Sequence, residues 1–345
     1  MEPNVVLPLA SSLLSLVLFV LLVDQWVDRR RPYQLIWAIG MLWYGLSAGT
    51  EFLGGAVGWS EPLYRAWYLI GAVWVAGWLG LGTMFLLGRT RFGYGAALSV
   101  LLAGLFTFLS WLRYDYPDSG ITPYLYSVIA VIAAIAIAVE TYRGRDRWAN
   151  VAGVLIVGGS IVAIPLVLMA PLAAPGYAVD PATGIPTGEL FPGYVRLLTP
   201  FFNITGGFAL ALGALYSAYV FMPKQRMIRY RLDRRDGLLR YAGNLALAPV
   251  AITVNLFASI PRAVVDLFAG RLNSRVPATI LIAIGGFVPS VTSGLNRFGE
   301  TTAFFLGEFL GAAFITAGFL VSIEVFREFR IPFTRRVLHA RRAAP

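Results

Sequence analysis

Long apolar runs without charged residues most constrain what this chain can fold into. Nine such runs follow one another along its 345 residues. A helix needs about 20 residues to cross a hydrocarbon core about 30 Å thick, and the runs have about that length or more. Because they are continuously apolar and do not alternate with polar positions, they predict helices and not barrel strands. We therefore expect an all-α integral membrane protein with about nine transmembrane helices. The predicted spans are residues 4–23, 34–57, 66–88, 93–112, 121–139, 150–172, 197–222, 276–296 and 301–323.

The charged residues between the runs predict an orientation. Glu2 precedes the first run without any Lys or Arg, whereas Arg29, Arg30 and Arg31 follow it. This polarity places the N-terminus outside and the C-terminus in the cytoplasm. All but four of the 28 Lys and Arg residues then lie on the cytoplasmic side. Because the positive-inside rule accounts for the net charge of +10, we expect no nucleic-acid partner. The expected location is the inner (plasma) membrane, as a multi-pass protein.

Residues 244–260 are apolar but do not make a clear tenth span. Their 17 residues reach only about 25 Å as a helix, and Pro249, Asn255 and Pro261 interrupt the segment. We predict amphipathic helices at the inner interface, which leaves re-entrant or spanning arrangements open. The basic residues just before them would contact anionic lipid headgroups. The expected organisation is a seven-helix bundle (1–222), a basic cytoplasmic and interfacial connector (223–275), a transmembrane hairpin (276–323) and a basic cytoplasmic tail (324–345).

Several kinds of chemistry are excluded by residues that the chain lacks. It has no cysteine, and its single histidine, His339, lies in the C-terminal tail. Thiolate and histidine ligands for a metal, a haem or an iron–sulfur cluster are therefore absent from the spans, so we expect no cofactor. Its single lysine, Lys224, lies in no glycine-rich phosphate loop and in no span. We do not expect an enzyme, although carboxylate chemistry remains open.

Three polar residues inside the predicted spans are candidates for a binding site. Glu51, Asn203 and Glu308 each lie about 10 Å below the outer surface at helical rise. Buried groups of this kind need partners in hydrocarbon. Three arginines lie near the outer ends of spans: Arg65, Arg196 and Arg297. We predict a polar cluster or cavity that opens to the outside, binds a ligand or ion, and pairs the carboxyl groups with one or more arginines. The alternative is that the polar residues only bridge helices.

Glycine pairs recur near the centres of three spans, and they favour close helix packing over hinge motion. The pairs are Gly158 with Gly159, Gly206 with Gly207, and Gly285 with Gly286. Similar sequence in the sixth and eighth spans, and in the seventh and ninth, is also compatible with a duplicated hairpin.

The segments DRRRPYQLIWAIGMLWYGLSAGTE (28–51) and LYRAWYLIGAVWVAGWLGLGTMFLL (63–87) carry a resemblance. They resemble uncharacterised bacterial multi-helix membrane proteins, and they are loosely similar to the seven-helix sensory regions that precede histidine kinases. The resemblance covers about the first 220 residues and implies a seven-helix sensory bundle. It does not extend to an output domain, because the connector and a further hairpin follow here.

Three functions are compatible with these observations. The favoured one is a non-enzymatic, sensor-like module or accessory subunit of a membrane complex, which binds lipid or another hydrophobic ligand and has protein partners. The alternative is a small-solute transporter or channel, in which Glu51, Asn203 and Glu308 line a cavity that extends inward. The third is a membrane enzyme acting on lipid or quinone.

Overall fold

The computed structural model is a bundle of long helices. It describes residues 2–114, 116–144, 146–174, 176–180, 184–296, 301–322, 328–334 and 337–340. The helices of the first half are α1 (Pro3–Arg29), α2 (Pro32–Val57), α3 (Glu61–Trp67), the π-helix η1 (Tyr68–Trp74), α4 (Val75–Leu86), α5 (Gly93–Arg113), α6 (Thr122–Tyr142) and α7 (Trp148–Leu168). Those of the second half are η2 (Gly188–Leu190), α8 (Gly193–Arg196), α9 (Leu198–Phe221), η3 (Arg234–Asp236), α10 (Leu238–Phe268), α11 (Arg275–Asn296) and α12 (Thr301–Val321).

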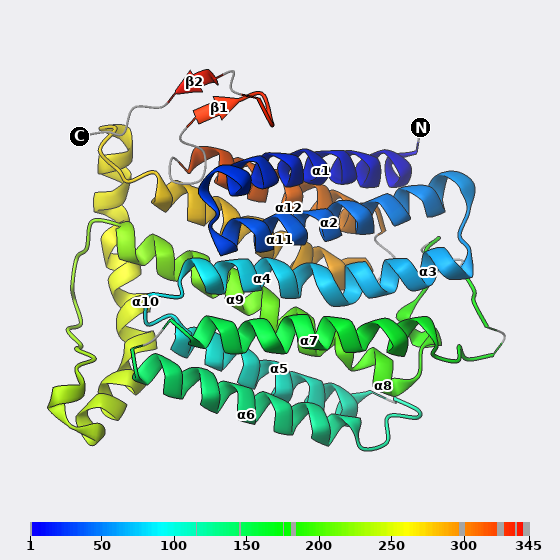
Figure 1. Cartoon of the computed structure of the whole chain (residues 1–345), viewed down its shortest axis with the longest axis horizontal. Helices are drawn as coiled ribbons and strands as arrows, with labels where there is room; N and C mark the ends of the chain where they lie inside the picture. Colours follow the sequence, from blue (N-terminus) through cyan, green and yellow to red (C-terminus); the bar gives the residue numbers. More distant parts are fainter. Residues whose placement is uncertain are drawn as a thin grey trace.

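Eight of the nine predicted spans each coincide with one long helix, and the third, 66–88, coincides with the continuous run of α3, η1 and α4; these helices run side by side (Figure 1). By length and composition alone, the described residues also contain nine candidate spans, but one helix differs. α10 qualifies and α2 does not, because α2 is rich in glycine and in aromatic residues of low hydropathy. Figure 1 shows that α2 lies between α1 and α4 within the bundle, whereas α10 lies crosswise over the ends of the other helices. α10 is therefore set apart from the other long helices by its direction.

Six of the helices form a closed ring. Around this ring α1 packs on α2, α2 on α4, α4 on α9, α9 on α11, α11 on α12, and α12 on α1. The helices α5, α6 and α7 form a second layer against α4 and α9. The most extensive pairing is between α11 and α12, while α7 packs mainly on α6 and α4 instead of α9. The hairpins that resemble each other in sequence are therefore packed differently.

Glycines allow the backbones of α4 and α9 to touch. A Cβ atom on Gly80 would overlap the backbone of Gly206, and one on Gly206 would overlap the carbonyl of Ala76. Gly207, the other member of the pair, has open space around it. One glycine of this pair thus packs, as the sequence predicts, while its neighbour faces the interior cavity described below.

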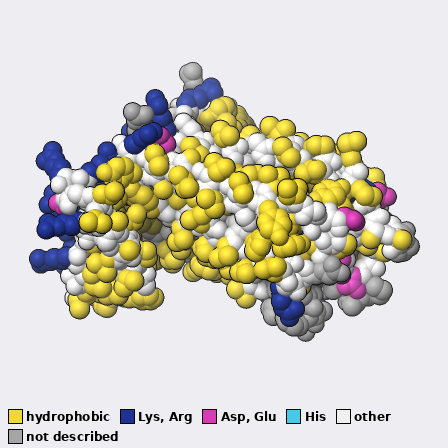
Figure 2. Space-filling view, turned by 90° about the horizontal axis from the view of Figure 1, so that it is seen from below, with side chains coloured by type: hydrophobic (Ala, Val, Ile, Leu, Met, Phe, Trp, Pro, Cys, Tyr) yellow, Lys and Arg dark blue, Asp and Glu magenta, His cyan; other side chains and the backbone are white. Residues whose placement is uncertain are grey.

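Charged side chains differ between the two ends of the bundle. In Figure 2 the Lys and Arg side chains gather at the end that α10 covers, and acidic side chains lie mainly at the opposite end. We call the α10 end the inner end and the α3 end the outer end.

Two short strands, β1 (Glu328–Arg330) and β2 (Val337–Ala340), form an antiparallel pair after α12. They are a small departure from the expected all-α fold. The backbone N–H of Phe333, between them, donates to Asp24 Oδ1 at the inner end of α1 over 2.7 Å. The described part of the predicted tail therefore returns to the inner end of the bundle.

Candidate functional site

A cavity of about 540 Å³ lies inside the helical ring, in its outer half. Side chains from α2, η1, α4, α9, α11 and α12 line this outer cavity, and most of them are apolar. One wall is η1, where the N–H of Val75 bonds to the carbonyl of Ile70, one residue further back than in an α-helix. Single turns of π-helix are frequent at functional sites because they redirect side chains. Gly71 in this turn packs against the hydroxyl of Ser47, which also lines the cavity.

The polar side of the outer cavity is a pair of carboxyl groups. Glu51 on α2 and Glu308 on α12 are within hydrogen-bonding reach of each other. Glu51 is 2% exposed, and its Oε1 accepts from the indole N–H of Trp67 over 2.8 Å. Oε2 of each glutamate is buried and accepts no hydrogen bond from an N–H or O–H donor of the described residues. Tyr44 donates to the backbone oxygen of Glu308 over 2.7 Å and so joins α2 to α12 beside the pair.

A hydrogen bond between two carboxyl groups needs a proton on one of them. Two adjacent carboxylates repel each other, and in apolar surroundings each is also poorly solvated. A shared proton removes one charge and satisfies the facing oxygens. The pair can therefore hold a proton. Among the described residues, no three His, Cys, Asp or Glu side chains are grouped as a metal site.

The structure brings together three of the six predicted site residues. Asn203 on α9 lines the outer cavity with Glu51 and Glu308. Arg65, one of the three arginines named as possible partners of the carboxyl groups, has other partners in the structure. Its guanidinium instead forms an ion pair with Glu61 at 2.8 Å, because both lie one helical turn apart on α3.

Arg65 also caps a neighbouring helix. It donates to the carbonyl oxygens of Val167, over 2.7 Å, and Ala170, over 3.0 Å, at the C-terminal end of α7. A cation at a helix C-terminus satisfies carbonyl groups that have no partner within the helix. Arg196 lies over the ring of Tyr116 at 4.4 Å, and Arg297 lies outside the described residues. The arginines that are described thus stabilise the outer end of the protein.

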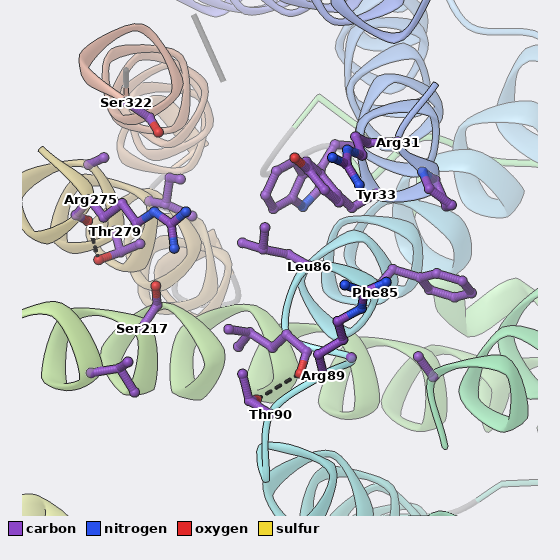
Figure 3. A pocket seen from close by; sticks show the side chains of 18 of the residues that line it. Arg31, Tyr33, Phe85, Leu86, Arg89, Thr90, Ser217, Arg275, Thr279 and Ser322 are labelled. Carbon is purple, nitrogen blue, oxygen red and sulfur yellow. Dashed lines mark hydrogen bonds between the residues drawn. The ribbon is translucent and has the colours of Figure 1, made fainter. Parts of the chain in front are cut away.

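A second cavity, of about 640 Å³, opens in the inner half of the same ring. Figure 3 shows this inner cavity, in which Arg275 and Thr279 of α11 face Arg31 and Tyr33 across the open space. The guanidinium of Arg275 is packed 4.1 Å from the ring centre of Phe221. Hydroxyl groups add hydrogen-bonding capacity to this basic wall. The charged and hydroxyl-bearing lining residues are Arg29, Arg31, Arg89, Arg275, Asp146, Tyr33, Thr90, Ser217, Thr279 and Ser322.

A thin apolar layer separates the two cavities. Three of its side chains line the outer cavity, three line the inner cavity, and all six belong to one buried cluster. The indole of Trp37 and the ring of Phe319 meet edge to face at 4.6 Å across the ring of helices. We call these six residues the middle layer: Leu79, Leu210 and Ile315 on the outer side, and Trp37, Ile282 and Phe319 on the inner side.

The sequence did not single out Trp67, η1 or the inner cavity. Trp67 is one of nine tryptophans, and its link to Glu51 depends on how α3 packs against α2. In the sequence, membrane topology alone accounts for the inner arginines. Their positions at the ends of successive spans were the available signal, because helix ends that form one ring bring such residues together.

The chain matches no protein-family model, no curated protein and no solved structure. The function is therefore argued from the site itself.

Proposed function

We propose that this protein is a small-solute carrier of the membrane, in which the Glu51–Glu308 pair binds a proton that is coupled to solute movement. The observation that carries this proposal is the pair of cavities in one ring of helices, on opposite sides of the middle layer. A carrier exposes one binding site alternately to the two sides of the membrane, usually by moving groups of helices around it. Here only a few apolar side chains would have to separate for the outer cavity to reach the inner one.

The polar groups favour a solute with negative charge. Four arginines line the inner cavity against a single described acid, Asp146. Guanidinium groups bind carboxylate or phosphate oxygens through two parallel hydrogen bonds. An anion entering the outer cavity would be repelled by ionised glutamates, and protonation of the pair removes that repulsion. This coupling makes co-transport of a proton with the anion the expected mode.

A second candidate is the sensor-like binding module or accessory subunit, and the middle layer favours it. Those six side chains belong to one buried apolar cluster. A receptor needs only one accessible cavity and can keep this layer closed. The outer cavity, with its mainly apolar lining, would then bind a hydrophobic ligand.

Proteoliposomes test the carrier against the binding module. The full chain is reconstituted with a pH-sensitive dye inside, and small anions are added outside: acetate, lactate, succinate, phosphate and glutamate. The carrier predicts anion-dependent acidification of the lumen, which Glu308→Gln abolishes and Glu189→Gln, at an exposed outer position, does not. Absence of such flux, together with a protein or hydrophobic ligand retained through purification in mild detergent, would favour the binding module.

A further inference from the structure

A third large cavity lies outside the ring, where α10 crosses the inner ends of α5 and α9. Its volume is about 840 Å³. The floor of this groove is apolar and is built from leucines of α5 and α9 on one side and from apolar residues of α10 on the other. These floor residues are Leu98, Leu101, Leu212, Leu215, Leu245, Ile252 and Leu256. Leu98 and Leu101 are 43% and 42% exposed, so the floor continues onto the outer surface of the bundle.

A basic segment forms the rim of the groove. Residues 224–231 run along α10 and contribute Lys224, Arg226, Arg229 and Arg231 to the lining. The loop before α5 adds Arg91, which donates to the hydroxyl of Tyr241 over 2.7 Å. The rim therefore has several cations beside an apolar floor.

Side chains of α10 hold the basic segment in place. Asn255, which is 1% exposed, accepts from the backbone N–H groups of Met227 and Ile228 and donates to the Ile228 carbonyl over 2.8 to 3.0 Å. Ser259 accepts from the N–H of Gln225 over 2.9 Å. In the sequence, Asn255 is a polar interruption of an apolar segment. In the structure it fixes the basic rim over the groove.

Asp233, an acidic residue near the rim, has local partners. Asp233 pairs with Arg231 at 2.6 Å. The backbone N–H of Arg235 and the guanidinium of Arg231 hold the pKa of Asp233 below its usual value, so it stays ionised. It offsets one arginine of the rim and leaves the remaining cations in excess.

We propose that this groove binds one anionic phospholipid of the inner leaflet, with its phosphate at the basic rim and its acyl chains along the floor. The division of the groove into an apolar floor and a cationic rim matches the two parts of such a lipid. The same end of the molecule carries most of the basic residues in view in Figure 2, as expected for a surface beside anionic headgroups. Exposed apolar side chains of α10, including Phe257 and Phe268, give this helix a second surface for the interface. The proposal does not depend on the carrier function.

Native mass spectrometry of the full chain in detergent tests the site, with phosphatidylglycerol and phosphatidylcholine of equal chain length as probes. We expect one phosphatidylglycerol to bind at least tenfold more tightly than phosphatidylcholine. Arg226→Gln with Arg229→Gln should lose at least tenfold in that affinity, because each basic residue near an anionic lipid contributes about fivefold. The matched control, Arg240→Gln with Arg262→Gln, removes two exposed charges of α10 that do not line the groove and should lose less than twofold.

Equal losses in both double variants would overturn the proposal, because only diffuse charge would then matter. Equal binding of the two lipids would also overturn it. Competition by inorganic phosphate alone would show that the rim binds a phosphate without the lipid and would count against the assignment. Leu101→Trp fills the floor without changing charge and should also weaken phosphatidylglycerol, so the test remains decisive if the arginine variant fails to fold.

Discussion

The carboxyl group of Glu51 on α2 lies against that of Glu308 on α12, at the wall of a cavity between these helices. The two helices meet through few contacts. One further contact is the hydrogen bond that the Tyr44 hydroxyl donates to the Glu308 carbonyl oxygen. An acidic pair at such a place is costly unless a proton or a ligand neutralises it. This relationship links the fold, in which α12 closes the ring, to the proposed proton-coupled function.

Replacing Glu308 tests the shared proton. In Glu308→Gln the amide can donate to Glu51, so we expect the free energy of unfolding to change by less than about 1 kcal/mol. Glu308→Ala leaves Glu51 buried without this partner and should cost about 3 kcal/mol. Infrared difference spectra should show a protonated carboxyl band in the wild type that is lost in Glu308→Gln. The exposed control Glu189→Gln should retain the band, and its loss there would contradict the assignment.

Trp67→Phe removes the indole N–H that donates to Glu51 while keeping an aromatic ring. We expect a loss of about 1 kcal/mol in thermal unfolding and, in proteoliposomes, a shifted pH dependence of transport. The matched control is Trp78→Phe, because Trp78 donates to Ser160 over 3.2 Å, away from the carboxyl pair. It should lose similar stability without altering the pH dependence. An equal shift in both variants would show that Trp67 does not act on the pair.

Gly206→Ala tests the contact of α4 with α9. The new Cβ would overlap the backbone of Ala76, which cannot move without separating the helices, so we expect a loss of about 3 kcal/mol or failure to fold. Gly207→Ala places the same methyl group one residue later in open space and should change stability by less than about 0.5 kcal/mol. Unfolding midpoints measured in one detergent compare the two. Similar values would indicate that the close approach of α4 and α9 is not required.

Arg65→Gln removes the charge that caps α7. Arg65 contacts two carbonyl groups and Glu61, and its side chain is only 13% exposed, so we expect a loss of about 2 kcal/mol. Arg113→Gln, an exposed arginine near the same end, serves as the control and should lose little. Because Arg65 does not contact the carboxyl pair, transport per folded molecule should be unchanged. A selective loss of transport would contradict the structural role given to Arg65.

Much of the fold could be predicted because lipid imposes simple rules. Apolar length located the nine bundled helices, including α2, whose glycines and aromatic residues lower its hydropathy. α10 differs from the expectation of an interrupted segment, because it runs as one helix through Pro249 and Pro261, and its Asn255 makes hydrogen bonds to the segment before it. The packing of α7 did not follow, because α7 lies mainly on α6 and α4 and not on α9, although the sequences of α7 and α9 resemble those of the paired helices α11 and α12.

The site was predicted in part for equally physical reasons. Glu51, Asn203 and Glu308 were recognised because polar groups are rare in spans, and their equal depth favoured one cluster. Arg65, one of three candidate arginines, binds elsewhere, because an acid one turn away and free carbonyl groups at a helix end compete for its guanidinium. Trp67 could not be chosen from nine tryptophans without knowing the packing of α3.

The central claim is that the middle layer opens alternately to the two sides of the membrane. Thiol labelling from each side of the membrane tests this claim and does not require the solute to be known. The chain has no cysteine, so single variants need no other change. Ile315→Cys lies on the outer side of the layer and Ile282→Cys on the inner side. Ser60→Cys and Arg240→Cys, at exposed outer and inner positions, report the sidedness of the vesicles. The carrier predicts that a membrane-impermeant thiol reagent labels Ile315→Cys and Ile282→Cys from both sides, while each exposed control is labelled from one side. Labelling of the two middle-layer cysteines from only one side each would contradict the carrier and identify a closed binding module.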